Sequence, residues 1–447
     1  MAKYKITNPY ENVTNLLGNM EHHYKTNLHT HSTYSDANDT MTDMIIGFYD
    51  NDFDIVAFAE HGILGKYWDE KPTHIPFFNF QYLWHGKRSY LTEEQYKGIK
   101  AGTYKTEKNT RTKTRGLEDV PDAIECNMFT IMKNHVNGYF TDNAYEGVQG
   151  LEYDYEIPMA LIEKSGGISH INHPTDLLQS WKRPDCAKDP KNIAFFANLL
   201  MKFPSCMGIE VLNMYDIPNR SDRILWDELL KLLTPYGRKI FGFSNSDAHQ
   251  VDQIDTAFMD FILPEYSLDT LRNAMETGTF FSIARYAKNE LGEKFKGEGI
   301  CPRVTKIAVD NENDTITLTG INCKEIDWIA DGETIKTESI DADGEITTTI
   351  NLADYSDEIS CYVRAQLKGK GGICLTQAFV RDDGNMESLK KPILKEVMTK
   401  EQQKKRKFYS KKLGVLYGTL TKKIVQKLKA TEQSDLMKNC QVIIKKF

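Results

Sequence analysis

The sequence predicts an α/β domain that is followed by a small antiparallel β domain. Between residue 26 and about residue 285, short apolar runs alternate with longer stretches of helical periodicity, which is typical of α/β folds. From about residue 302 to residue 382 the runs are short and alternating, and turns rich in Asp and Gly separate them. A chain of 447 residues also exceeds the size that one core usually reaches. We therefore expect three parts, which span residues 1–298, 299–385 and 386–447.

The first part contains four apolar runs that have the length of buried strands, at residues 54–59, 167–172, 207–212 and 239–243. Helices are predicted at residues 41–50 and 224–233, because capping residues precede an apolar period of three to four. Several of the β runs end directly in His, Asp or Asn. In parallel α/β folds the loops that follow the strands converge on one face, so we expect a functional site there.

The second part should form a sandwich-like antiparallel domain, built from runs such as 315–319, 325–329 and 361–367. The third part is strongly basic, with 17 Lys and Arg against 5 Asp and Glu, whereas the whole chain has a net charge of −7. Apolar residues recur in it at helical spacing, which predicts a basic amphipathic helix. Such a tail can contact an acidic partner, an anionic membrane surface, or the acidic body of the same protein.

Residues 66–117 interrupt the α/β rhythm with a polar and aromatic segment that we interpret as an insertion. It holds 11 Lys and Arg against 5 Asp and Glu, and it follows directly after His61. One hypothesis is a lid over the site, in which Arg111 and Arg115 supply positive charge to an anionic substrate. The alternative is a solvated decoration of the surface.

Targeting and cysteine patterns indicate a cytoplasmic protein. No run of about 18 apolar residues occurs, and no apolar core follows the lysines of the N-terminus, so neither a transmembrane segment nor secretion is expected. The eight cysteines are dispersed without a Cys-x-x-Cys pair, which favours reduced thiols over disulfides or a thiolate zinc site.

Metal-ligand residue types are repeated at the ends of the predicted strands. His29 and His31 lie on the same side of an extended backbone, because side chains alternate with a period of two. A single His-x-His pair is a weak signal, but further ligand types follow three other strands. We therefore expect a metal cluster whose members include His29, His31, Asp36, His61, His173, Asp247 and His249.

These motifs resemble those of the polymerase and histidinol phosphatase (PHP) domain family, over residues 27 to about 285. The family's opening His-x-His with a nearby Ser-Asp is similar to His29, His31 and Asp36, and its His-Pro and Ser-Asp-x-His elements are similar to 173–174 and 246–249. Two elements depart from the family pattern: Glu60 precedes His61 where Asp is commoner, and Asp122 stands where Gly is usual. Glu125 and His135 match the remaining elements.

The resemblance implies a distorted seven-stranded (β/α) barrel with two to three divalent ions. The implied ligands of the first ion are His29, His31, Glu125 and Asp247. Those of the second ion are Glu125, His135 and His173, and those of the third are Asp36, His61 and His249. Glu125 would bridge the first two ions, and Glu152 is the competing candidate for that role because the insertion makes the alignment ambiguous.

The mixture of imidazole and carboxylate suits Zn, Mn or Fe, and a hydroxide shared between two such ions can attack phosphorus. We therefore expect a phosphoesterase that acts on a small phosphorylated molecule or a nucleotide, with Glu125, Asp247 and His249 as its catalytic ligands. Glu210 and Asn213 end another strand, and they contact substrate, support the metal ligands from behind, or cap a loop. The alternatives are a hydrolase of C–O or C–N bonds and a non-catalytic binding protein stabilised by metal.

Overall fold

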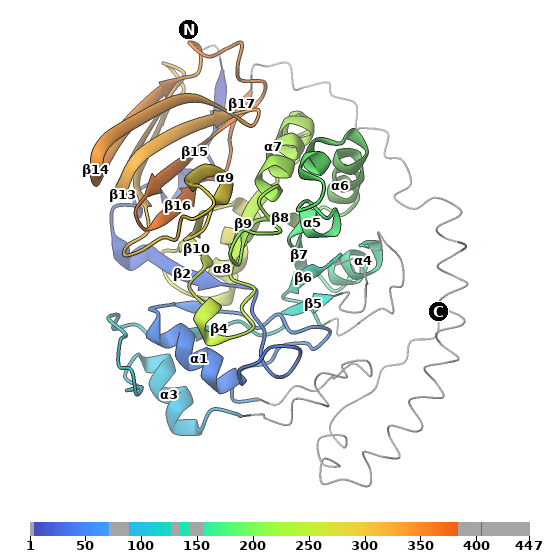
Figure 1. Ribbon diagram of the computed structural model, residues 1–447, viewed down its shortest axis with the longest axis vertical. Coiled ribbons are helices and arrows are strands. Elements are labelled where there is room, and N and C mark those ends of the chain that lie inside the picture. Colours follow the sequence, from blue (N-terminus) through green and yellow to red (C-terminus); the bar gives the residue numbers. More distant parts are fainter. Residues whose placement is uncertain (1–3, 71–88, 127–133, 143–154, 383–403, 405–447) are drawn as a thin grey trace.

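The computed structural model describes residues 4–70, 89–126, 134–142 and 155–382, together with residue 404 (Figure 1). It confirms the prediction of a mixed α/β protein with more than one sheet. The predicted tail at residues 386–447 and the candidate Glu152 lie outside the described residues. Within the described part of the chain, no helix is long and apolar enough to cross a membrane.

The first sheet region starts with parallel strands, because β2 (His23–Asn27) pairs with β3 (Ile55–Val56) and β3 pairs with β4 (Glu118–Asp119). A second sheet has the order β5-β6-β7-β8-β9. Its last three strands are parallel, whereas β6 is antiparallel to both of its neighbours. These strands span Ile124–Cys126 (β5), Val136–Tyr139 (β6), Ile168–Ile171 (β7), Cys206–Asn213 (β8) and Phe241–Asn245 (β9).

Two single β-bridges link the two sheets. Thr30, beyond the end of β2, is bridged to Ala248, beyond the end of β9. His61, beyond the end of β3, is bridged to Glu125 on β5. The residues that follow β2, β3 and β9 are therefore held beside β5 at one face of the fold.

Helices connect these strands. Helix α1 spans the predicted residues 41–50, and α7 ends at the predicted residue 233 but begins two residues earlier than predicted, at Asp222. Thr40 caps α1 through a reciprocal capping box with Asp43, which satisfies two amide groups at the helix start. Figure 1 shows α6 and α7 side by side against β8. The α-helices span Met41–Asp50 (α1), Glu93–Ala101 (α3), Glu156–Lys164 (α4), Pro174–Leu177 (α5), Pro190–Lys202 (α6), Asp222–Leu233 (α7), Leu268–Thr277 (α8) and Lys288–Leu291 (α9). Short 3-10 helices span Glu11–Val13, Met20–His22, Pro184–Lys188, Thr234–Tyr236 and Val251–Gln253.

The alternating runs after residue 302 form antiparallel strands, as predicted. They continue the first sheet, because β16 pairs with β11, β11 pairs with β10, and β10 pairs with β2. The N-terminal β1 pairs with β17. The strands span Lys5–Thr7 (β1), Ala257–Ile262 (β10), Phe280–Ala284 (β11), Arg303–Asp310 (β12), Thr315–Ala330 (β13), Glu333–Asn351 (β14), Tyr362–Gly369 (β15), Gly372–Leu375 (β16) and Phe379–Asp382 (β17).

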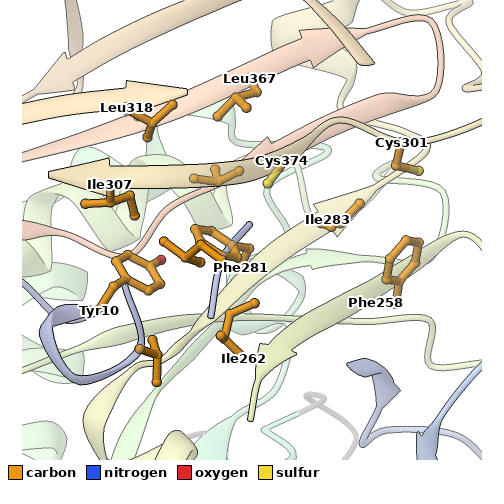
Figure 2. Packing of buried hydrophobic residues seen from close by; sticks show 14 of the residues in the cluster. Tyr10, Phe258, Ile262, Phe281, Ile283, Cys301, Ile307, Leu318, Leu367 and Cys374 are labelled. Atoms are coloured by element: carbon orange, nitrogen blue, oxygen red, sulfur yellow. The ribbon is translucent and has the colours of Figure 1, made fainter. Parts of the chain in front are cut away.

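One hydrophobic core crosses the expected boundary at residue 298. Phe281 and Ile283 of β11 belong to the same buried cluster as Leu318 of β13 and Leu367 of β15 (Figure 2). All four side chains are inaccessible to solvent. The α/β part and the antiparallel strands are thus packed together through apolar contacts, while their division into separate domains stays a prediction.

Candidate metal centre

The residues that the sequence nominates as ligands come together at the carboxyl ends of the strands. His29 and His31 follow β2, and His61 follows β3. Glu125 lies on β5, and His173 is the residue before α5. The remaining members are Asp36 in the loop before α1, His135 at the start of β6, and Asp247 and His249 after β9.

Glu125 lies at the middle of this cluster and is almost inaccessible to solvent. Its Oε1 atom is 3.3 Å from His29 Nε2 and 3.0 Å from His135 Nδ1. Its Oε2 atom is 3.2 Å from His31 Nε2 and 3.0 Å from His61 Nδ1. Both carboxylate oxygens therefore face imidazole nitrogens, which is the arrangement that a carboxylate shared between two ions requires.

Asp247 lies on the other side of the paired histidines. Its Oδ1 atom is 3.3 Å from His29 Nε2 and 3.1 Å from His31 Nε2. His173 Nε2 is more distant, at 3.9 Å from Asp247 Oδ2 and 3.8 Å from Glu125 Oε1. The backbone of Asp247 has φ of 47°, and its amide donates to the carbonyl of His29.

Asp36 forms the centre of a third group. Its Oδ2 atom is 3.3 Å from His61 Nε2, and its Oδ1 atom is 3.3 Å from His249 Nε2. The carbonyl of Asp247 lies 2.8 Å from His249 Nδ1, which leaves Nε2 to face Asp36. His31 lies beside this group as well, with Nδ1 4.0 Å from Asp36 Oδ1.

The donor atoms fit divalent metal ions in spacing and in orientation. In a tetrahedral site with bonds of about 2.0–2.1 Å, neighbouring donors are about 3.3 Å apart. Several pairs around Glu125, Asp36 and Asp247 have separations of 3.1–3.3 Å. Three sets of ligand atoms lie close enough together to hold an ion, and they are His29/His31/Glu125, His61/Glu125/His135 and His31/Asp36/His61/His249.

Hydrogen bonds do not account for these short separations. Four of the buried atoms, His29 Nε2, His31 Nε2, His61 Nδ1 and Glu125 Oε2, have no hydrogen-bond partner among the described residues, although oppositely charged atoms lie within 3.3 Å. The carboxylate oxygens are therefore out of line with the ring N–H directions. Buried polar atoms without partners are costly, so their concentration here supports a bound cation.

Without metal, the histidines and carboxylates of the cluster shift one another's pKa values. Burial lowers the pKa of His249, but Asp36 and Asp247 outweigh that effect and raise it to about 9. Burial also opposes protonation of His173, yet Glu125 and Asp247 raise its pKa to about 9. For Glu125, burial favours the neutral acid, but the surrounding histidines hold its pKa well below the usual range. Ions that bind here must displace protons from imidazoles.

Glu210 and Asn213 lie behind the cluster, where they position ligands instead of facing a substrate. Glu210 is fully buried, and its Oε1 atom is 2.8 Å from His29 Nδ1. Its Oε2 atom accepts a hydrogen bond of 3.1 Å from the amide of His173. Asn213 donates to the same oxygen at 3.0 Å. Of the alternatives for these two residues, the contacts favour support of the ligands over contact with substrate, because their polar atoms are used inside the protein.

Two positioning residues were not assigned from the sequence. Asn172 donates to Glu125 Oε1 at 2.6 Å, and the hydroxyls of Ser32 and Ser35 both donate to Glu60. Burial raises the pKa of Glu60 despite these bonds and the nearby His31. Their place in the sequence could have identified them, since Asn172 and Glu60 each directly precede a candidate ligand at a strand end.

The insertion does not bring Arg111 and Arg115 to the cluster. Arg111 donates to the carbonyls of Tyr49, Phe53, Arg115 and Gly116. Arg115 donates to the carbonyl of Glu21, which precedes β2. Because Phe53 precedes β3, these contacts lie at the amino ends of β2 and β3, opposite the ligands. The expectation that the two arginines bind substrate is therefore wrong, and they hold the insertion against the body.

Comparison with known proteins adds little to this geometry. The chain matches no family model and no curated protein. Among solved structures it is similar to a two-domain protein from Bacteroides vulgatus that contains a predicted PHP-like metal-dependent phosphoesterase, with 14% identity and a TM-score of 0.41 over 80% of this chain and 95% of that one. It is also similar to PsfC from Pseudomonas syringae, with 16% identity and a TM-score of 0.33 over 57% and 88%. At TM-scores this low, the likeness carries no argument about fold or function.

Proposed function

We propose that this protein is a metal-dependent phosphoesterase of PHP type that uses two to three divalent ions, of Zn, Mn or Fe. The observation that carries the proposal is the position of Glu125, whose two oxygens face four histidines that come from the ends of three strands, β2, β3 and β6. The motifs at these strand ends resemble those of PHP proteins, and all nine expected ligands lie in one cluster.

A seven-stranded barrel is part of the same proposal. In one sheet β2 pairs with β3 and β3 pairs with β4, and in the other sheet the order runs from β5 through β6, β7 and β8 to β9. The bridge between Thr30 and Ala248 returns the circuit from β9 to β2. The bridge between His61 and Glu125 joins β3 to β5. These two links support closure, since without them the strands form two separate sheets.

Three sets of residues would each hold one ion. Glu125 and Asp247, with His29 and His31, would hold one ion, and Glu125 would also serve a second ion with His135 and His173. Asp36, His61 and His249 would hold a third. When bound, such ions lower the pKa of water and neutralise the phosphoryl oxygens of a substrate.

The protein contributes orientation and charge to this reaction. Glu210 and the Asp247 carbonyl fix the ring orientation of His29 and His249, so that the Nε2 atoms face the cluster. His249 and Asp36 are partly exposed, whereas His29 and His31 are fully buried. A substrate would therefore reach the cluster from the side of Asp36 and His249. We propose a small phosphorylated molecule or a nucleotide as that substrate.

A substrate screen tests the proposed activity. Purified protein loaded with Mn²⁺ is assayed against phosphomonoesters, phosphodiesters and carboxylic esters in parallel. We expect hydrolysis of phosphate esters that Asp247→Asn abolishes, because that change removes a metal-ligating charge. Asp252→Asn is the matched control, since Asp252 lies in the 3-10 helix just after His249 and accepts only from Gln250 among the described hydrogen bonds. Turnover of carboxylic esters alone would contradict the proposal.

A further inference from the structure

A network of buried polar residues contacts the backbone around His173 and extends to the start of α7. Asp222, the first residue of that helix, is fully buried, and its Oδ1 atom accepts a hydrogen bond of 2.7 Å from the amide of Thr175. Thr175 lies in the first turn of α5, two residues after His173. The carboxylate of Asp222 is therefore in direct contact with the turn that carries His173.

The network returns to His173 from its other side. The amide of Asp222 donates to the carbonyl of Asn219 at 2.9 Å, and Asn219 Nδ2 donates to Asn213 Oδ1 at 3.0 Å. Asn213 in turn donates to Glu210, which accepts from the amide of His173. Hydrogen bonds thus form a ring from His173 through β8 and α7 and back to α5, and all its members are buried.

His173 has a backbone conformation that needs such support. Its φ of 27° and ψ of 57° are in the left-handed region, which is unfavourable for a residue with a side chain of this size. The hydrogen bonds to Glu210 and from Thr175 to Asp222 restrain the peptide unit before His173 and the one between Pro174 and Thr175. The surroundings therefore hold His173 in a conformation that it would not adopt alone.

Three buried atoms beside this turn have no hydrogen-bond partner among the described residues. They are His173 Nδ1, Thr175 Oγ1 and Asp222 Oδ2. A buried water typically makes about three hydrogen bonds to polar groups that are otherwise unsatisfied. Histidine ligands of metals nearly always donate their second ring N–H to a carboxylate, a carbonyl or a water. A water that reached all three atoms would satisfy both requirements.

We propose that Asp222 is a positioning residue for His173, which it holds through the amide of Thr175 and through one buried water on His173 Nδ1. The inference rests on the proposed metal centre, because the effect of this positioning is to aim His173 Nε2 at Glu125 and Asp247. A purely structural role is the competing explanation. That explanation would rest on the place of Asp222 in the first turn of α7, where an acidic side chain in its charged form stabilises a helix N-terminus.

The test compares Asp222→Asn with Asp227→Asn in the full-length protein. Asp227 is a buried acid on the same helix that is paired with Arg364 and has no contact with the network among the described residues. Mn²⁺ binding is measured by equilibrium dialysis, and thermal stability is measured without metal. We expect Asp222→Asn to weaken one Mn²⁺ site about 10- to 100-fold. Asp227→Asn should lower the melting temperature at least as much and bind Mn²⁺ like the wild type.

A second variant keeps the test decisive if Asp222→Asn does not fold. Thr175→Val removes one partner of the water but retains the amide bond to Asp222, so a smaller loss of affinity at the same Mn²⁺ site is expected. Unchanged Mn²⁺ binding in Asp222→Asn, or in Thr175→Val if Asp222→Asn does not fold, would overturn the positioning role while the metal centre stands. A wild-type protein that binds no Mn²⁺ would overturn the metal centre itself, and the inference with it.

Discussion

The carboxylate of Glu210 lies 2.8 Å from Nδ1 of His29, and this contact fixes Nε2 as the nitrogen that faces Glu125 and Asp247. The same carboxylate accepts from three further donors, which are Asn245 Nδ2, Asn213 Nδ2 and the amide of His173. Glu210 therefore supports ligands of both ions that Glu125 would bridge.

Glu210→Gln is expected to weaken metal binding about 10- to 100-fold. The amide offers one acceptor oxygen in place of two, so its NH2 group opposes two of the four donors. Titration of the metal-free protein with Mn²⁺ measures the effect. Glu290→Gln is the control, because it disturbs a different ion pair, with Arg223. Equal Mn²⁺ affinity in the two variants would contradict this role for Glu210.

Arg111→Ala is expected to lower the free energy of unfolding by roughly 2 kcal/mol or more, because four carbonyls lose a charged donor. Its effect on KM for a phosphate ester should be small, since the guanidinium is remote from the cluster. Urea denaturation and steady-state kinetics measure the two quantities. Lys108→Ala, an exposed change in the same segment, should alter neither. A raised KM with unchanged stability would restore the lid hypothesis.

Metal binding should release protons at neutral pH. In the metal-free protein the pKa values of His173 and His249 are raised to about 9, so both imidazoles are largely protonated at pH 7. Because an ion competes with these protons, apparent affinity should rise with pH and level off only above pH 9, where both imidazoles are neutral. Calorimetric titration in two buffers with different ionisation enthalpies counts the protons. A binding enthalpy that does not depend on the buffer would mean that none is released.

The basic segment at residues 386–447 is a separate prediction that the described residues do not test. A chain that ends at residue 385 is expected to keep its metal content, because the candidate ligands all lie between residues 29 and 249. It should lose salt-sensitive binding to vesicles of anionic lipid. Vesicles of neutral lipid are the control. If the shortened chain loses its metals, the segment contributes to the folded body instead.

The sequence was sufficient to predict most of the cluster, because ligand type and strand position coincide. His-x-His after β2, His61 after β3 and Asp247 after β9 each combine an apolar run with a polar end, and parallel strands place such ends on one face. Helix α1 was equally predictable, because Thr40 and Asp43 provide a local capping signal.

The sequence left the roles of Arg111 and Glu210 open between alternatives, because these roles depend on contacts between distant segments. A basic segment after a ligand has the same composition whether its arginines face a substrate or bind backbone carbonyls at the opposite end of the strands. Glu210 and Asn172 likewise resemble ligands in type and position, and only the fold shows that they lie behind the histidines. The pairing of β16 with β11 is also non-local, and no pattern in either segment indicates it.

The most direct test of the proposed metal centre is the number of divalent ions bound per chain. Protein stripped of metal is dialysed against Mn²⁺, and its metal content is measured by elemental analysis, alongside Glu125→Gln and Asp252→Asn. We predict two to three ions in the wild type and in Asp252→Asn, and at least one ion fewer in Glu125→Gln, because Glu125 would be shared between two ions. One ion or none in the wild-type protein would contradict the account.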